Sequence, residues 1–461
     1  MLISLSWVLW YLFKEEDETQ QLKLSLPLLL VAGGWVFLSG VGGYAFQNWD
    51  HHWRNAVLRD LISYDWPVIY SNPNQGPIKM LVYYVGDWLP AALAGKLFGW
   101  KVANFVLFLW TWAGVLLASL HLSLTLKTSA FKALLFLIFF SGMDALGALL
   151  FAQNGYPTLW PPIQHLEIWS GNLQYSSFTT QLFWVFNQAV PAWLCVSLIW
   201  GLDKQEKTSQ KILIWSLCFF FAPLASIGFF PYVFVQWLKQ TDFKSPFKNI
   251  HIGLILVSIL IIFVSYLFFS SNPAAQERGL QNIAIKDFAT FFLFEGGLIW
   301  LLLSPFMWRD SCGTSLEFCF SLFLLYSLVA DGFVMRASQF APLFYLMGMT
   351  AEILFQNSPS RFYRIVFASI LLIGAITPLY EINRSLYRTF EYDFVLDESQ
   401  RITTPPGPAT HLEQGVAPEN EHPFTLTADD IQTLKYMNDK LSKNFIANVR
   451  QSLYYQYLSP R

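Results

Sequence analysis

Repeated apolar runs of about twenty residues are the feature that most constrains what this chain can fold into. A helix of that length crosses the hydrocarbon core of a bilayer. The chain of 461 residues is 54 % hydrophobic and only 13 % charged, whereas a soluble domain usually carries about 25 % charged residues. Backbone polar groups inside a bilayer need internal partners, so the runs predict helices. We therefore expect an all-α polytopic membrane protein. A net charge of −2 and the lack of a nucleic-acid-binding motif predict no nucleic-acid partner.

About ten apolar runs are expected to be transmembrane helices, and two further runs are interrupted. Leu81–Trp100 contains Asp87 and Pro90, which favour a surface or re-entrant element over a span. Ile212–Trp237 is broken by Pro223 and is expected to form a hairpin of two short helices. The expected spans cover residues 1–13, 25–46, 102–126, 133–152, 180–201, 250–270, 289–308, 315–330, 337–356 and 365–380.

Lysine and arginine are concentrated in alternate loops, which indicates the orientation of the chain. With the loop 47–101 outside, most lysines and arginines of the membrane region fall in the loops of the opposite side, so we expect the loop 47–101 to face away from the cytoplasm. The predicted organisation is a transmembrane domain over residues 1–380, with outer loops at 47–101 and 153–179. Residues 381–461 are polar and are expected to form a small extracytoplasmic C-terminal region.

The stretch from Asn48 to Pro67 follows the run 25–46 and becomes charged at once. At helical spacing it has an apolar stripe and a polar stripe, which is typical of a helix lying at the membrane surface. Asp50 stands at the start of that helix. The apolar stripe consists of Trp53, Val57, Leu61 and Tyr64, and the polar stripe of His52, Asn55, Arg59 and Ser63.

An acidic residue just outside the first complete span, followed by a surface helix, resembles the GT-C superfamily of membrane glycosyltransferases. Members of that superfamily transfer a sugar from a lipid-linked phosphosugar. The resemblance implies a GT-C-like fold, a catalytic role for Asp50 and an inverting transfer. This chain departs from the best-known members because His51, and not a second acid, follows Asp50, and because it lacks a large soluble domain.

The second outer loop is rich in amides, hydroxyls and indoles, which suits the binding of a polyol. His165, Glu167, Gln174 and Tyr175 are its candidate substrate-binding residues. In an extended loop His165 and Glu167 can both point into one cavity. The alternatives are a hydrogen-bonded loop histidine and an interfacial aromatic belt in place of sugar-stacking platforms.

A cation near the donor phosphate is implied by the same resemblance. Arg336 stands at the outer edge of a span, and a guanidinium there can bind a phosphate through two hydrogen bonds. Arg54 and Arg59 are rival candidates for this role. The alternative for Arg336 is a snorkelling side chain paired with Asp331.

Ionisable residues within spans are functional candidates because their burial in lipid is costly. Glu295 is expected at the floor of the cavity, whereas Asp144 is expected to make a helix–helix hydrogen bond. His51 and His52 are assigned to substrate binding. Adjacent imidazoles point apart on a helix, so we predict no metal and no other cofactor.

The predicted function is transfer of a sugar from a polyprenyl-phosphate or related lipid-linked donor. The acceptor is a cell-envelope glycan, lipid or protein on the extracytoplasmic side, and the expected location is a bacterial inner membrane. The alternatives are a lipid or solute transporter or flippase, and a non-catalytic subunit of an envelope-assembly machine. Broken helices and intramembrane acids also occur in transporters, but the polar residues here gather in loops on one face.

Overall fold

The computed structural model describes most of the chain between residues 24 and 390. The described ranges are 24–48, 50–70, 79–151, 162, 165–170, 173–202, 208–240, 250–271, 284–310, 318–319, 340–356 and 361–390, together with the strand pairs 396–397, 401–402 and 426–427. The predicted Arg336 and the side chain of His52 lie outside this description.

Within these ranges the protein is an all-α membrane protein with six helices that are long and apolar enough to cross a membrane. The expectation of about ten spans is corrected to six for the described part of the chain. The expected spans 1–13 and 315–330 lie outside the described residues apart from 318–319, and of 337–356 only the 17-residue helix Phe340–Gln356 is described. The run 25–46 forms a helix too short to count as a span, because it ends before Gly40. The six are Trp100–Leu126, Ala130–Phe151, Phe178–Gly201, Ile252–Ser270, Ile285–Pro305 and Ile365–Thr389.

Helix α2 (Leu26–Leu38) illustrates this shortening, because the expected span 25–46 ends eight residues early. Ser25 caps its first turn by accepting a hydrogen bond from the Leu28 amide. After Leu38 the chain turns through Gly40 and Gly42, both at positive φ near 80°, into the short helix η2 (Val41–Gly43). Glycine adopts that backbone conformation without the steric cost of a Cβ.

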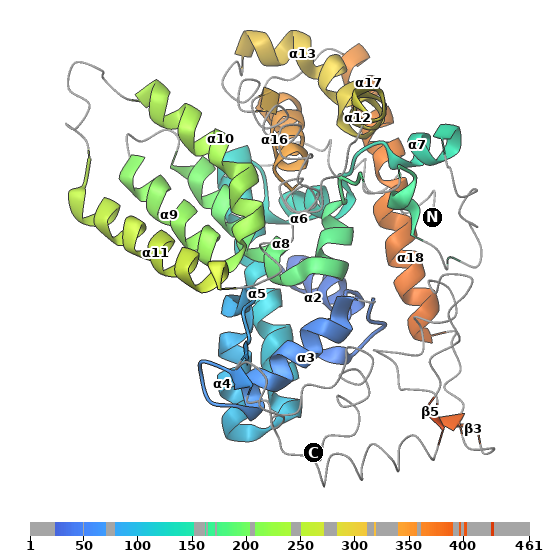
Figure 1. Ribbon diagram of the computed structural model, residues 1–461. Helices are drawn as coiled ribbons and strands as arrows, with labels where there is room; N and C mark the ends of the chain where they lie inside the picture. The colour runs from blue at the N-terminus through green and yellow to red at the C-terminus, as the bar shows by residue number, and fades with distance from the viewer. Residues whose placement is uncertain are drawn as a thin grey trace.

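Helix α8 (Phe178–Gly201) is the most extensively buried of the six and lies at the centre of the molecule (Figure 1). It packs against α2, α5 (Trp100–Leu126) and α6 (Ala130–Phe139). The Trp35 indole of α2 stacks on Trp193 at 5.7 Å and donates a hydrogen bond to Thr179 Oγ1 at 3.2 Å. Polar contacts inside an apolar bundle fix how helices are oriented, since the groups have no water to bond instead.

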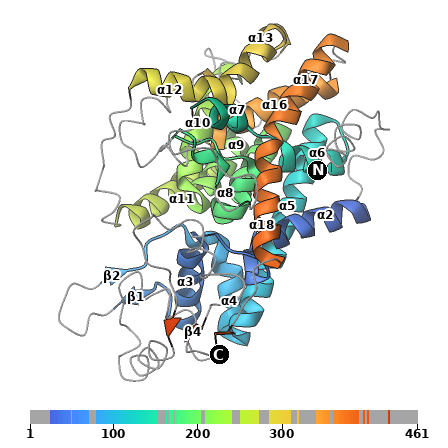
Figure 2. The same ribbon diagram turned by 90° about the vertical axis from the view of Figure 1, so that its right-hand side faces the viewer.

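Helices α3 (Asp50–Ser63) and α4 (Leu89–Phe98) pack together at one end of the bundle, and both views place them there (Figures 1 and 2). Along the chain, α3 is followed by the short antiparallel strands β1 (Ile69–Tyr70) and β2 (Lys79–Met80) and by the 3₁₀ turn η3 (Val85–Trp88), which leads into α4.

The expected division of α3 into polar and apolar faces needs correction. Its inner face carries the buried polar residues His51, Arg54 and Asn55 as well as Leu58 and Leu61. That face packs on α8, so α3 is not simply a surface helix with its polar side in water. Buried polar groups need partners, and α8 supplies several of them.

The stretch Ile212–Trp237 forms two helices, α9 (Thr208–Phe221) and α10 (Pro223–Gln240), which pack on each other. The break falls at Pro223, which lacks the amide that a continuous helix would use. Helix α11 (Ile252–Ser270) packs on α9 but leaves most of its apolar side chains exposed. Such a surface suits contact with lipid chains.

Two breaks meet at the other end of the bundle. One separates α6 from α7 (Asp144–Phe151), and the other is the single π-helical turn η6 (Leu293–Gly297). The Met143 amide donates a hydrogen bond to the Glu295 carbonyl at 3.1 Å, so a backbone donor at one break pairs with a backbone acceptor at the other. The π turn lies between α12 (Ile285–Phe292) and α13 (Leu298–Asp310).

The C-terminal part of the bundle consists of α16 (Phe340–Gln356), α17 (Arg361–Gly374) and α18 (Ile376–Phe390). Helix α18 packs on α2, α6 and α8. The domain boundary expected at residue 380 therefore falls inside α18, a helix that belongs to the bundle. Beyond it, strands β3 (Leu396–Asp397), β4 (Arg401–Ile402) and β5 (Leu426–Thr427) pair in antiparallel fashion.

We predict that Gly142→Ala destabilises the protein. A Cβ at this position would lie 2.6 Å from the backbone carbonyl oxygen of Glu295, so the two breaks would have to separate. The expected loss is about 1–3 kcal/mol, measured as a lower unfolding temperature in detergent. Gly34→Ala on α2 is the control, because its Cβ would have nothing within 4 Å. Equal unfolding temperatures for the two variants would contradict the prediction.

Candidate functional site

Asp50 and Arg54 form the centre of the candidate site. The Asp50 side chain at the start of α3 is 38 % exposed, and Arg54, one turn later, is 4 % exposed. Arg54 Nη2 donates to Asp50 Oδ2 at 3.1 Å, and its Nε donates to Asn187 Oδ1 of α8 at 2.9 Å. The guanidinium therefore holds an accessible carboxylate at a fixed place beside α8.

Two buried donors at this place, Arg54 Nη1 and Asn187 Nδ2, have no acceptor among the described residues. A third unpaired donor, Trp184 Nε1, lies on the same helix beside His165 and Arg384. Leaving a buried donor unpaired costs about 1–3 kcal/mol, and more for a charged group. A ligand rich in acceptor oxygens, such as a phosphate ester, would remove this cost.

Asn48, two residues before Asp50, connects the same region to α18. Its Oδ1 accepts a hydrogen bond from Arg384 Nη2, and its Nδ2 donates to the Phe183 carbonyl at 3.2 Å. Arg384 also donates from Nε to Glu381 Oε2 at 3.3 Å. The predicted His51 bonds the Phe183 carbonyl through Nε2 at 2.8 Å, so in this structure it fixes α3 to α8.

Arg384 lies among aromatic rings as well as polar groups. Its guanidinium carbon is 5.6 Å from the Phe46 ring centroid and 5.5 Å from that of Trp184. The guanidinium carbon of Arg388 also lies over the Phe46 ring, 5.0 Å from its centroid. Cations over aromatic faces are stabilised electrostatically, and more strongly where water is excluded.

Three residues of this region, Glu381, Arg384 and Arg388, were not predicted from the sequence. They are spaced three and four residues apart after an apolar run, which puts them on one helical face. That pattern could have placed them in a helix facing the site. They were overlooked because the polar C-terminal region was expected to begin at residue 381.

The predicted loop residues His165, Glu167 and Gln174 do come together. His165 Nδ1 is 2.5 Å from Glu381 Oε1, and Gln174 Nε2 lies 3.1 Å from His165 Nε2 and 2.9 Å from Glu167 Oε2. With Gln174 donating to Nε2, neutral His165 donates from Nδ1 to Glu381. The loop is thus connected through Glu381, Arg384 and Asn48 to the segment that carries Asp50.

Glu167 is completely buried at the first turn of α8. Its Oε1 accepts hydrogen bonds from the Ser177 amide at 2.9 Å and from Thr180 Oγ1 at 2.6 Å. Burial, reinforced by the nearby Asp144 carboxyl, raises the pKa of Glu167 to about 7. Burial alone would lower the pKa of His165, but the Glu381 and Glu167 carboxylates outweigh it and raise that pKa above its usual value.

Tyr175 and Glu295 lie in a second buried cluster. The Tyr175 ring packs on Phe291 at 4.9 Å, and Glu295 Oε1 accepts a hydrogen bond from Trp169 Nε1 at 2.9 Å. In the described residues no hydrogen bond joins either side chain to Asp50. Asp144 makes the expected helix–helix contact, since its Oδ2 accepts from Thr377 Oγ1 of α18 at 3.3 Å.

The predicted Arg59 lies farther along α3, beside Asp60. Asp60 accepts a hydrogen bond from the Tyr70 hydroxyl at 2.5 Å, which fastens α3 to β1. Burial raises the pKa of the Asp60 carboxyl and outweighs the Tyr70 hydrogen bond and the Arg59 charge, which both lower it. This places Arg59 with a structural carboxylate, whereas Arg54 contacts the candidate site.

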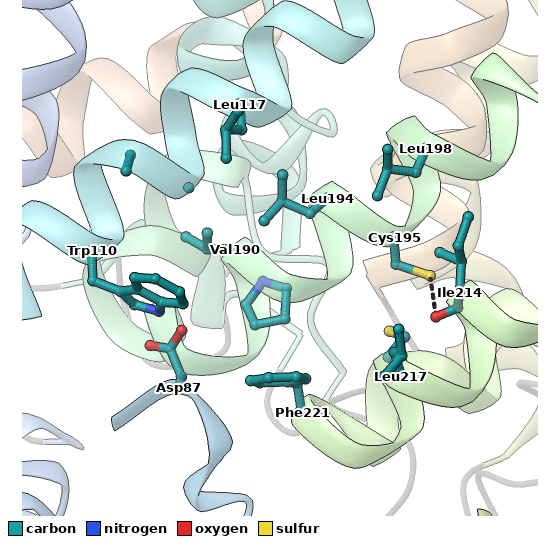
Figure 3. A pocket seen from close by; sticks show the side chains of 14 residues that line it. Asp87, Trp110, Leu117, Val190, Leu194, Cys195, Leu198, Ile214, Leu217 and Phe221 are labelled. Carbon is teal, nitrogen blue, oxygen red and sulfur yellow. Dashed lines mark hydrogen bonds between the residues drawn. The ribbon is translucent and has the colours of Figure 1, made fainter. Parts of the chain in front are cut away.

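An apolar groove of about 260 Å³ lies between α5, α8 and α9 (Figure 3). Asp87 and Trp110 lie together at one end, where the indole gives the carboxyl a hydrogen bond. Burial raises the pKa of Asp87 to about 7. Three of the lining side chains are exposed on the outer surface of the bundle, namely Trp110, Leu117 and Leu217. The groove is therefore open toward the surrounding lipid.

Among the described residues, no group of three or more His, Cys, Asp or Glu side chains is arranged to hold a metal ion. Comparisons with protein-family models, with curated proteins and with solved structures found no match.

We predict that stability falls as the pH rises from about 4.5 to 7 and that Glu167→Gln reduces this dependence. The folded pKa of Glu167 is raised above its unfolded value, so the folded state holds a proton that the unfolded state releases in this interval. His165 acts in the same direction above its unfolded pKa, because its folded pKa is also raised. The measurement is the unfolding temperature of both proteins across this pH range. Parallel curves would refute the role given to Glu167.

Proposed function

We propose that this protein is a membrane glycosyltransferase of the GT-C type that uses a polyprenyl-phosphate or related lipid-linked sugar donor. The observation that carries the proposal is the pairing of an accessible carboxylate with a buried guanidinium that still has an unpaired donor. Such a pair supplies the two functions that transfer from a phosphosugar needs, a base for the acceptor and a cation for the departing phosphate.

Asp50 is the proposed general base. Its carboxylate takes the proton of an acceptor hydroxyl while that oxygen bonds to the anomeric carbon of the donor sugar. The bond from the anomeric carbon to the phosphate oxygen breaks with inversion, and the electron pair leaves on the phosphate. General-base catalysis supplies about 10²–10⁴-fold, and positioning and charge stabilisation supply the remainder.

Arg54 is the proposed partner of the departing phosphate. Nη2 and Nε are already bonded to Asp50 and Asn187, so the orientation of the guanidinium is fixed before substrate arrives. Nη1 and Asn187 Nδ2 remain to bind phosphate oxygens as their negative charge increases. Arg336 keeps its predicted role as a second phosphate ligand.

The apolar groove is the proposed site for the hydrocarbon chain of the donor. It runs along α8 at Val190, Leu194 and Leu198, and Asn187 lies one turn before it on the same helix. Helix α9 of the broken hairpin forms one wall (Figure 3). A lipid chain in the groove would leave its phosphate near Arg54.

The proposed acceptor is a cell-envelope glycan, lipid or protein, and the proposed location is a bacterial inner membrane. The distribution of lysine and arginine between the loops supports an extracytoplasmic position for Asp50.

We predict that Asp50→Asn lowers sugar transfer by about 10²–10⁴-fold with little change in folding. Membranes containing the variant are assayed with radiolabelled polyprenyl-phosphate sugars, and folding is followed by thermal unfolding. Asp65→Asn, an exposed carboxylate at the other end of the same segment, is the control and should keep wild-type transfer. Full transfer by a folded Asp50→Asn protein would eliminate Asp50 as the base.

We further predict that Leu194→Trp raises the KM for a long-chain donor about tenfold while changing kcat much less, because the larger ring occupies the groove. A donor with a short, water-soluble chain should be affected less, since it does not fill the groove. Leu124→Trp, on the exposed surface of α5 and outside the groove lining, is the matched control. Equal effects on both donors would show that the groove does not hold the lipid chain.

Transport is the second candidate function, and one observation favours it. Asp144 and Glu295 are buried acids inside spans, at the two breaks that face each other, and acids at broken helices are common in transporters. Measuring substrate movement and covalent transfer in the same vesicles separates the two functions. Movement without transfer would favour the transporter.

A further inference from the structure

The segment between β2 and η3 forms a second wall of the Asp50 site. It carries Tyr83 and Tyr84, whose ring centroids are 3.9 Å apart with 31° between the planes. The Tyr83 ring also packs against the Trp88 ring, with 5.8 Å between the centroids. Both tyrosines are only partly buried, so an aromatic surface remains accessible beside the site.

Gln188 fastens this segment to α8. Its Nε2 donates to the Tyr84 hydroxyl at 3.0 Å, whereas its neighbour Asn187 bonds Arg54. Asp50 and Arg54 are both close enough to Tyr83 and Tyr84 to act on them electrostatically. Two consecutive residues of α8 therefore connect the tyrosine pair and the Asp50–Arg54 pair.

The unpaired groups on the two sides of this arrangement differ. Toward Arg54 they are donors, which suit phosphate oxygens. Toward the tyrosines they include an acceptor, because Gln188 Oε1 is buried and receives no hydrogen bond from the described residues, together with the buried donor Trp88 Nε1 beside Tyr83. Hydroxyl groups are the donors that such an acceptor would bind.

The tyrosines add one donor, the Tyr83 hydroxyl, because the Tyr84 hydroxyl already donates to Tyr83. Burial raises the pKa of Tyr83 and raises that of Tyr84 still further, so both phenols stay protonated at physiological pH. Aromatic rings also present flat apolar surfaces with polar tips. A pyranose combines a ring of C–H bonds with hydroxyls at its edge, and it matches both properties.

We propose that Tyr83, Tyr84 and Gln188 form a sugar-binding subsite beside Asp50, in which the tyrosine pair packs on a pyranose ring and Gln188 Oε1 accepts a hydrogen bond from one of its hydroxyls. The inference rests on the proposed function, because it concerns the sugar that meets Asp50. The same chemistry would serve the sugar of the donor or a sugar of the acceptor.

The test is saturation-transfer NMR of the full chain in lipid nanodiscs, using as probes the methyl pyranosides of glucose, mannose, galactose and N-acetylglucosamine. The wild-type protein should transfer saturation to at least one of them. Gln188→Leu and Tyr83→Ala should each reduce that signal about five- to tenfold, as expected for the loss of one hydrogen bond or one ring contact. Tyr44→Phe, an exposed tyrosine on a different segment, should leave it unchanged.

Asp50→Asn separates this inference from the proposed function. It should keep the sugar signal while lowering transfer by about 10²–10⁴-fold. Loss of transfer in Asp50→Asn together with an unchanged sugar signal in Gln188→Leu would overturn the subsite and leave the transferase. Retained transfer in Asp50→Asn would overturn the base assignment, while the NMR comparison would still decide the subsite. A wild-type protein that binds none of the four probes also overturns the subsite.

A transfer assay then identifies the source of the sugar. If the subsite holds the donor sugar, Gln188→Leu raises the KM for the lipid-linked donor. If it holds the acceptor sugar, the same variant raises the KM for the acceptor. An unchanged KM for both would overturn the assignment.

Discussion

The bonds of Arg54 are the constraint on which the candidate site depends. A guanidinium that is 4 % exposed cannot stay charged at the end of an apolar bundle without partners. Asp50 and Asn187 supply two of them, and in doing so they fix the N-terminal end of α3 against the middle of α8. The accessibility of Asp50 follows from this arrangement, since the arginine is buried beneath the carboxylate and leaves the acid on the open side.

Helix α8 is the scaffold for every other part of the site. Its first turn is bonded to Glu167, its central turns carry Trp184, Asn187 and Gln188, and its later turns line the apolar groove. The helix is irregular at Val185, where φ is −136°, between the Phe183 carbonyl that bonds His51 and the Asn187 side chain that bonds Arg54. A polar segment inside a span is costly unless its groups are bonded. Here the hydrogen bonds come from α3 and from the segments that carry Glu167 and Tyr84. Helix α18 adds the Arg384 guanidinium over the Trp184 ring, so these segments gather around the polar groups of α8.

Part of this arrangement was predictable from local sequence. Asp50 and Arg54 are four residues apart, so any helix brings them together. The gathering of His165, Glu167 and Gln174 was expected from the polar character of their loop. Glu381 and Arg384 were missed because residue 380 was taken as the end of the membrane domain. Tyr83 and Tyr84 were missed because they lie in the interrupted run 81–100, and Gln188 because it lies within the span 180–201.

The sequence by itself determined that the protein crosses a membrane as helices, since apolar runs of that length have few other stable forms in a bilayer. It also determined that an acid and a basic residue lie one helical turn apart at the start of α3. Only the tertiary structure decided that His51, Arg54 and Asn55 of α3 face inward. It also decided that Asn187 completes the bonds of Arg54 and that Glu381 joins His165 across 216 positions of the chain. The physical reason is that apolarity and helical spacing are local properties. The partner of a buried charge is chosen by which distant segments pack against it, and hydropathy does not encode that choice.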